Sequence, residues 1–309
     1  MELNKESRAL VDAMSAAIPT GGGDPVAFRE NMEAGRMPPA PEDAVAITDV
    51  DADGIPVRIY RPDGVTGRLP VLVYFHGGGF VSGSIATFDR LCQRLARLSG
   101  CAVASVEYRL APEHPFPAAP DDAERATRWI AANGDAHDLD TARMALGGDS
   151  AGGNLALVTA IRFRDGGGPP IAHLLLIYPA VDLASERPSH EQFGDGFFVN
   201  RAFSDMCLSA YTPDAADRVD PVASPLRTDS LADLPSATVV VAGCDPARDD
   251  SLALIDRMRN DGVAVNDQVH EGTFHGFLSM FGMLAQADDA VEQAGRTLSG
   301  ALHDEGEAR

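Results

Sequence analysis

The stretch MALGGDSAGGNLAL, residues 144–157, decides the fold. It begins as an apolar run, turns through small residues and continues in a helix-like pattern. Gly148, Ser150 and Gly152 form a G-x-S-x-G motif at the turn. A strand-to-helix turn this tight needs small neighbours and strained dihedral angles, and it leaves the serine hydroxyl projecting from the end of a sheet. The stretch therefore predicts a nucleophile elbow, although a purely structural glycine turn would give the same motif.

Apolar strand-like runs alternate with helix-like segments along much of the chain. LPVLVYF at 69–75 and AVASV at 102–106 are apolar without alternation, as expected when helices cover both faces of a sheet. The order predicts a right-handed α/β fold with a mostly parallel central sheet of about eight strands. Ahead of it, AVAITDVDADGIPVRIYRP at 44–62 predicts a hairpin that turns at Asp53 and Gly54.

Two segments lie outside this alternation. Residues 1–45 begin with a helical pattern at 7–18 and then loosen, so they are expected to form an extension rather than part of the core. Residues 183–230 are too long for a plain loop and are expected to hold short helices above the sheet. We predict an N-terminal cap segment at 1–45, a cap insertion at 183–230, and a catalytic domain made of 46–182 and 231–309.

A serine hydroxyl is a weak nucleophile at its own pKa and needs a base, which a third group orients. In an α/β hydrolase both follow the serine, the acid first. His270 lies in a strand-like run and His275 in the loop GTFHGF, so His275 is the predicted base. Asp245 follows the strand ATVVVAG, where catalytic groups gather, and is the predicted acid. Asp249 and Asp250 open the next helix and are interpreted as supporting carboxylates.

The glycine-rich stretch HGGGF at 76–80 follows another apolar strand. Attack by Ser150 on an ester would develop an oxyanion, and one well-aimed backbone N–H stabilises such a charge by roughly 3–4 kcal/mol. Glycines let the backbone approach without side chains in the way. A phosphate-binding loop is the alternative, but the stretch lacks both the G-x-x-x-x-G-K-[ST] lysine and a G-x-G-x-x-G followed by a helix.

These motifs together carry a family resemblance. HGGGF at 76–80, YRLAPEHPFPAA at 108–119, GDSAGGNLA at 148–156, the acids at 245–249 and FHGF at 274–277 resemble those of the bacterial hormone-sensitive-lipase-like carboxylesterases. That family belongs to the α/β-hydrolase superfamily. The resemblance is specific because it spans most of the chain, well beyond a lone G-x-S-x-G.

The resemblance implies an intracellular serine esterase with a helical cap, no cofactor and no metal. It places the nucleophile on Ser150, the acid on Asp245 and the base on His275. It also implies three oxyanion donors, which are the backbone N–H groups of Gly77, Gly78 and Ala151.

Other residues of the same motifs are expected to be structural. The ring of His76 is interpreted as pinning the glycine loop, and Gly79 as part of that supporting loop. Arg109 and Glu113 are interpreted as a buried ion pair or a loop brace, with no role at the substrate.

The composition argues against some classes of binding partner. The net charge of −21 would repel nucleic acid and anionic membranes. The N-terminus has no apolar signal-like region, and no apolar run is long enough to span a bilayer. Four scattered cysteines show no metal-ligand spacing and are expected to be reduced, as in a cytoplasmic protein. The last strand could pair across a homodimer.

The predicted function is hydrolysis of short-chain neutral carboxylic esters, a small-molecule substrate class. A binding protein is the main alternative, because some plant hormone receptors keep this fold but have lost the catalytic histidine, whereas His275 is present here. An amidase or a long-chain lipase would use the same three residues. The many charges in 183–230 weigh against a lipase lid.

Overall fold

The prediction of a mostly parallel sheet is confirmed. In the computed structural model, which describes residues 1–15 and 23–303, eight strands form one sheet in the order β1-β2-β4-β3-β5-β6-β7-β8. The strands are β1 (Ala46–Asp51), β2 (Pro56–Arg61), β3 (Leu69–Phe75), β4 (Ala102–Val106), β5 (Leu139–Asp149), β6 (His173–Ile177), β7 (Ser236–Cys244) and β8 (Val265–Phe274). β2 pairs antiparallel with β1 and β4, which confirms the predicted hairpin, and the remaining pairs are parallel.

Helices follow most of the strands. They are α1 (Lys5–Ser15), α2 (Pro25–Ala34), α3 (Asp89–Ser99), α4 (Ala118–Asn133), α5 (Ala151–Gly166), α6 (Pro188–Gln192), α7 (Arg201–Tyr211), α8 (Arg248–Asn260) and α9 (Ala285–His303). Short 3₁₀ turns occupy η1 (Pro41–Asp43), η2 (Gly134–His137), η3 (Ala215–Val219), η4 (Pro225–Arg227) and η5 (Phe277–Met280). The last described helix, α9, begins at Ala285, after η5 and a turn.

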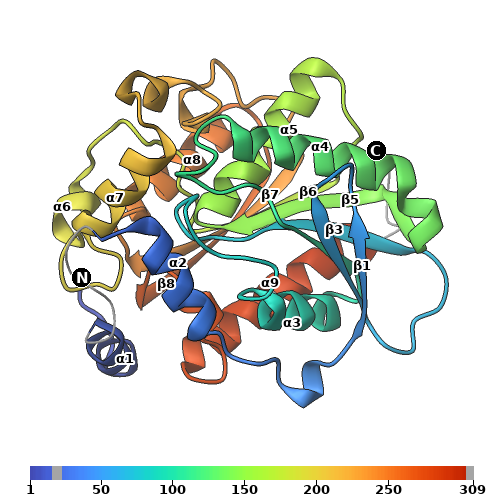
Figure 1. Ribbon diagram of the computed structural model, residues 1–309, viewed down its shortest axis with the longest axis horizontal. Coiled ribbons are helices and arrows are strands. Elements are labelled where there is room, and N and C mark those ends of the chain that lie inside the picture. Colours follow the sequence, from blue (N-terminus) through green and yellow to red (C-terminus); the bar gives the residue numbers. More distant parts are fainter. Residues whose placement is uncertain (16–22, 304–309) are drawn as a thin grey trace.

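Two apolar cores lie on the two faces of the sheet, which explains the unbroken apolar runs. Along β3, Val71 and Val73 join the core beneath α4, α5 and α8, whereas Leu72 and Tyr74 join the core beneath α3 and α9. Figure 1 shows the sheet between these two helical layers. Since successive side chains point to opposite faces, a strand covered on both sides must be apolar at every position.

The N-terminal segment contributes more to the packing than expected. Val11 of α1 is buried in the core with α9, and the buried Asp43 pairs with Arg94 of α3 at 2.8 Å. The expectation that residues 1–45 stay outside the core is therefore wrong for these positions. The last part of the predicted helix, residues 16–18, lies outside the described residues, as do residues 304–309 at the end of the predicted catalytic domain.

The expectation of short helices in residues 183–230 is confirmed by α6, α7, η3 and η4. α7 lies beside α2 from the N-terminal segment (Figure 1), and the rings of Phe203 and Phe28 meet with their centroids 4.8 Å apart. Two stretches that are distant in sequence thus meet on one side of the molecule.

The turn between β5 and α5 is held by contact with the end of β3. Ser150 has a φ of 54° and a ψ of −117°, a strained conformation for a residue with a side chain. A Cβ on Gly152 would overlap the backbone carbonyl of Phe75. Only a residue without a side chain allows α5 to start this close to β3, so the small residues of the motif follow from sterics.

We expect Gly152→Ala to destabilise the fold by about 1–3 kcal/mol or more, because the new methyl group meets backbone that cannot rotate away. The matched control is Gly166→Ala at the end of the same helix, where a Cβ meets nothing within 4 Å among the described residues. Urea unfolding of both variants is the measurement. Equal midpoints for the two variants would show that the contact does not constrain the fold.

Candidate active site

Three predicted side chains meet at the carboxyl ends of the strands. Ser150 lies between β5 and α5, Asp245 directly follows β7, and His275 directly follows β8. His275 Nε2 lies 2.8 Å from Ser150 Oγ, and His275 Nδ1 lies 2.7 Å from Asp245 Oδ2. These side chains come from positions up to 125 residues apart in sequence. The arrangement is a continuous chain of hydrogen bonds from a hydroxyl through an imidazole to a carboxylate.

The surroundings of His275 favour a proton on the ring. Burial by itself lowers the pKa of His275, but the charge of Asp245 and their hydrogen bond outweigh it, so the pKa lies above its ordinary value. The charge of Asp149 acts in the same direction. Asp245 is oriented in turn, since its Oδ1 accepts the backbone N–H of Ala247 at 2.7 Å. The imidazole can therefore take a proton from the hydroxyl and hold it as a stabilised cation.

The structure requires a correction for Gly77. Its backbone N–H donates to Asp149 Oδ1 at 2.8 Å in a buried position, so this amide is already engaged. Tyr74 donates its hydroxyl to the same oxygen at 2.7 Å. By contrast, the N–H groups of Gly78 and Gly79 have no hydrogen-bond partner within residues 1–15 and 23–303. The prediction that Gly77 is an oxyanion donor is not compatible with this bond.

His76 lies underneath the glycine loop. Its Nδ1 is 2.8 Å from the carbonyl of Gly77, and its ring stacks on Tyr108 with centroids 4.3 Å apart. The Tyr108 hydroxyl donates to the His76 carbonyl at 2.7 Å. Burial lowers the pKa of His76 to about 4, so the ring is neutral at neutral pH. These contacts agree with a structural role for His76 and give it no contact with Ser150.

Arg109 and Glu113 do not pair with each other. Arg109 pairs with the buried Asp122 of α4 at 2.7 Å, and Glu113 pairs with Arg29 of α2 at 2.9 Å. The expectation of a mutual ion pair is wrong, whereas both residues do brace their loop. Arg29 was not anticipated from the sequence, because only the fold brings α2 to this loop.

A cavity of about 510 Å³ opens onto Ser150. Its walls come from the glycine loop, the elbow, the insertion and the turn after β7. The residues that line it with Ser150 include Gly79, Phe80, Ala151, Leu183, Phe203, Cys207, Leu208, Asp245 and His275. Gly79 is in this wall, and Gly77 and Gly78 are not. The volume lies within the roughly 300–1,000 Å³ typical of sites for small organic molecules.

Within the described part of the chain, no cluster of three or more His, Cys, Asp or Glu side chains has the arrangement of a metal site. The four cysteines are buried thiols that form no disulfide with one another. None of the described helices combines the length and apolar character that crossing a bilayer requires.

Comparisons with known proteins agree with this geometry. Residues 72–279 match the family model described as the alpha/beta hydrolase fold. Esterase LipI of Mycobacterium tuberculosis is 38% identical, covering 87% of this chain and 85% of the relative. Ethyl acetate hydrolase of Pseudomonas putida is 36% identical, covering 80% of this chain and 79% of the relative. A hyperthermophilic esterase from the archaeon Pyrobaculum calidifontis superimposes with a TM-score of 0.90 at 36% identity, covering 97% of this chain and 99% of that one.

The chain therefore belongs to the alpha/beta hydrolase fold family, and its resemblance to the hormone-sensitive-lipase-like carboxylesterases is confirmed. It is an ester hydrolase by this relationship.

We expect Asp149→Asn to lower the pKa of His275. The amide oxygen can still accept the bonds from Gly77 and Tyr74, but the negative charge that favours the imidazolium is gone. NMR titration of His275 is the measurement. The comparison applies above pH 6, because burial raises the pKa of Asp149 to about 6.

Asp267→Asn, in β8 and far from His275, is the control for loss of one negative charge. Identical titration of His275 in wild type and in Asp149→Asn would show that the buried charge does not reach the imidazole.

Proposed function

We propose that this chain is a serine carboxylesterase that hydrolyses small, neutral, short-chain carboxylic esters through an acyl-enzyme. The observation that carries the proposal is the hydrogen-bonded series Ser150, His275 and Asp245, which opens onto a cavity of small-molecule size. The esterases among the relatives support the same reaction class.

In the first step His275 Nε2 takes the proton of Ser150 as its Oγ attacks the ester carbonyl. Asp245 holds the ring and stabilises the charge that it acquires. The imidazolium then gives its proton to the departing alcohol. In the second step water attacks the acyl group, His275 accepts a proton from that water, and Ser150 regains one as the acid leaves.

We propose Gly78, Gly79 and Ala151 as the donors to the oxyanion. Gly77 is excluded from this set because its N–H already donates a hydrogen bond to Asp149. Gly79 and Ala151 line the cavity beside Ser150, and Ala151 opens α5, where the first N–H groups of a helix have no partner inside the helix. Gly78 has a φ of 123°, which lets the loop turn its amides toward this point.

The cavity supports a neutral substrate. Two of the acidic side chains in its wall are already paired with arginines, Glu186 with Arg201 at 3.1 Å and Asp250 with Arg187. Apolar side chains such as Phe203 and Leu208 face the same space. An acyl or alcohol group without charge would exchange water for these apolar surfaces at no electrostatic cost.

We further propose that residues 183–230 form a cap together with α2 of the N-terminal segment, over the catalytic domain predicted at 46–182 and 231–309. Helix α7 supplies part of the cavity wall, and α2 packs against α7 through Phe28 and Phe203. Arg29 adds hydrogen bonds to the carbonyls of Val81 and Ala111, so the N-terminal segment is tied to the loop after HGGG and to the loop after β4.

We expect wild type to hydrolyse p-nitrophenyl esters of short acids and Ser150→Ala to lose at least about 1,000-fold in kcat, since the nucleophile is gone. Release of p-nitrophenol over a series of acyl lengths is the measurement, with circular dichroism as the control for folding. A folded wild type that is inert on every ester and amide offered would favour the binding-protein alternative.

The base must be neutral to act, so kcat/KM should fall as the pH drops through the pKa of His275, which Asp245 holds above the ordinary value for histidine despite burial. Asp245→Asn should move this fall to lower pH and reduce kcat by about 10⁴-fold, because the carboxylate no longer favours the imidazolium. Steady-state pH profiles of the two proteins are the measurement. A fall at the same pH in both would argue against Asp245 as the partner of His275.

A further inference from the structure

The catalytic acid stands at the start of a short turn, residues 245–249, which we name the acid turn. Asp245 accepts the N–H of Ala247 on Oδ1 and the N–H of Arg248 on its backbone carbonyl, at 2.7 and 3.0 Å. Because the donor to the carboxylate, Ala247, belongs to the turn itself, the direction of the carboxylate depends on the path of this backbone. Whatever holds the acid turn therefore also holds Asp245 against His275.

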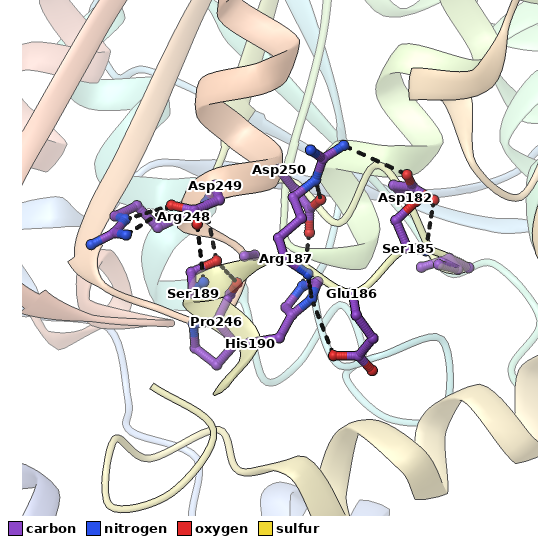
Figure 2. A network of polar contacts seen from close by, with 12 residues as sticks. Asp182, Ser185, Glu186, Arg187, Ser189, His190, Pro246, Arg248, Asp249 and Asp250 are labelled. Atoms are coloured by element: carbon purple, nitrogen blue, oxygen red, sulfur yellow. Dashed lines mark hydrogen bonds and ion pairs between the residues drawn. The ribbon is translucent and has the colours of Figure 1, made fainter. Parts of the chain in front are cut away.

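A serine of the insertion binds this turn. Ser189 of α6 is fully buried, and its Oγ donates to the carbonyl of Pro246 at 2.6 Å. The same Oγ accepts the N–H of Asp249 at 3.2 Å, and the N–H of Ser189 donates to Asp249 Oδ2 at 3.0 Å. Figure 2 shows these contacts between the insertion and the start of α8. One side chain thus bonds to the backbone at both ends of the turn.

Ser189 is itself held in place by its neighbours. Asp250, whose side chain is only 4% exposed, accepts hydrogen bonds from Arg187 and from His190 Nε2, the latter at 3.0 Å. His190 Nδ1 accepts the N–H of Arg187 at 3.0 Å, and this bond caps the N-terminus of α6. These bonds fix α6 on the first turn of α8 (Figure 2).

We propose that Ser189 is a positioning residue for the reaction: it acts through the acid turn to keep Asp245 in line with His275. The inference rests on the proposed esterase function. Without Oγ, the carbonyl of Pro246 and the N–H of Asp249 lose their bonds to it in a buried site. The turn must then move to find new partners, and the 2.7 Å bond between Asp245 and His275 lengthens.

The insertion thereby takes part in the catalytic geometry as well as in enclosing the substrate. His190, Pro246, Ala247 and Asp250 all line the cavity that opens onto Ser150. A substrate that fills this cavity touches both sides of the contact made by Ser189.

Ser189→Ala tests the proposal, and the chain offers a closely matched control. Ser224 is also fully buried and follows the insertion's η3; its Oγ donates to the carbonyl of Arg218 at 2.6 Å and accepts the N–H of Leu183 at 2.7 Å. Each substitution removes one buried hydroxyl that donates to one backbone carbonyl and accepts one backbone N–H. Only Ser189 touches the acid turn.

We expect Ser189→Ala to lower kcat for a p-nitrophenyl ester by about tenfold with little change in KM, because misplaced catalytic groups mainly cost turnover. The fall of kcat/KM at acid pH should also move to lower pH, since a more distant Asp245 favours the imidazolium less. Ser224→Ala should leave kcat and the pH of this fall as in wild type, whatever its effect on thermal stability or on KM, because its partners Leu183 and Arg218 line the cavity but do not touch the acid turn.

The pH profile separates geometry from charge. His275 faces Asp245, Asp149 and Tyr178. Arg248 and Asp249 belong to the acid turn, and Arg187, His190 and Asp250 lie beside it. Ser189→Ala removes none of these titratable or charged groups. A shifted profile therefore reports a change in the position of Asp245.

Asp249→Ala is the second variant if Ser189→Ala does not fold. It removes the carboxylate that holds the N–H of Ser189, at a side chain that is 21% exposed, and should lower kcat by a smaller amount than Ser189→Ala does. Because this variant also loses a charge, kcat is its readout and the pH profile is not. An unshifted profile and unchanged kcat in Ser189→Ala, or an unchanged kcat in Asp249→Ala in its place, would overturn the proposal. Wild type without esterase activity would instead overturn the proposed function.

Discussion

The close contact between the turn at Ser150 and the end of β3 is the constraint on which the site depends. Gly152 lies against the carbonyl of Phe75, and Asp149 accepts the N–H of Gly77. One contact is steric and the other is a buried hydrogen bond, and both join the nucleophile to the glycine loop. The proposed oxyanion donors and the serine are therefore placed by one rigid junction, which would lower the reorganisation that the reaction needs.

Around this junction, each buried carboxylate lies next to a cationic group or a hydrogen-bond donor. Asp245 faces His275, Asp250 faces Arg187 and His190, and Asp149 accepts from Tyr74 and Gly77. Such groups are costly to bury alone. Their partners come from several elements, so the same bonds that satisfy the carboxylates also join the insertion and the sheet into one site.

Local sequence patterns were enough to predict the sheet and the three side chains that meet at its edge, Ser150, Asp245 and His275. An elbow, a strand end and a loop each have a short sequence signature. What the sequence could not show was how amides and carboxylates far apart in the chain pair with one another. Gly77 and Gly79 cannot be distinguished in the sequence, and only the hydrogen bond from Gly77 to Asp149 shows which amide is already engaged. Arg29, Val11 and Ser189 were missed for the same reason, since their partners are brought near only by the folded chain.

The central claim is that Ser150 forms a covalent intermediate with its substrate. The most direct measurement is intact-protein mass spectrometry after incubation with a p-nitrophenyl alkylphosphonate, followed by peptide mapping. A single phosphonyl adduct on Ser150, absent from Ser150→Ala, is the predicted result. Wild type that hydrolyses esters but gains no adduct, or gains it at a different residue, would contradict the acyl-enzyme mechanism.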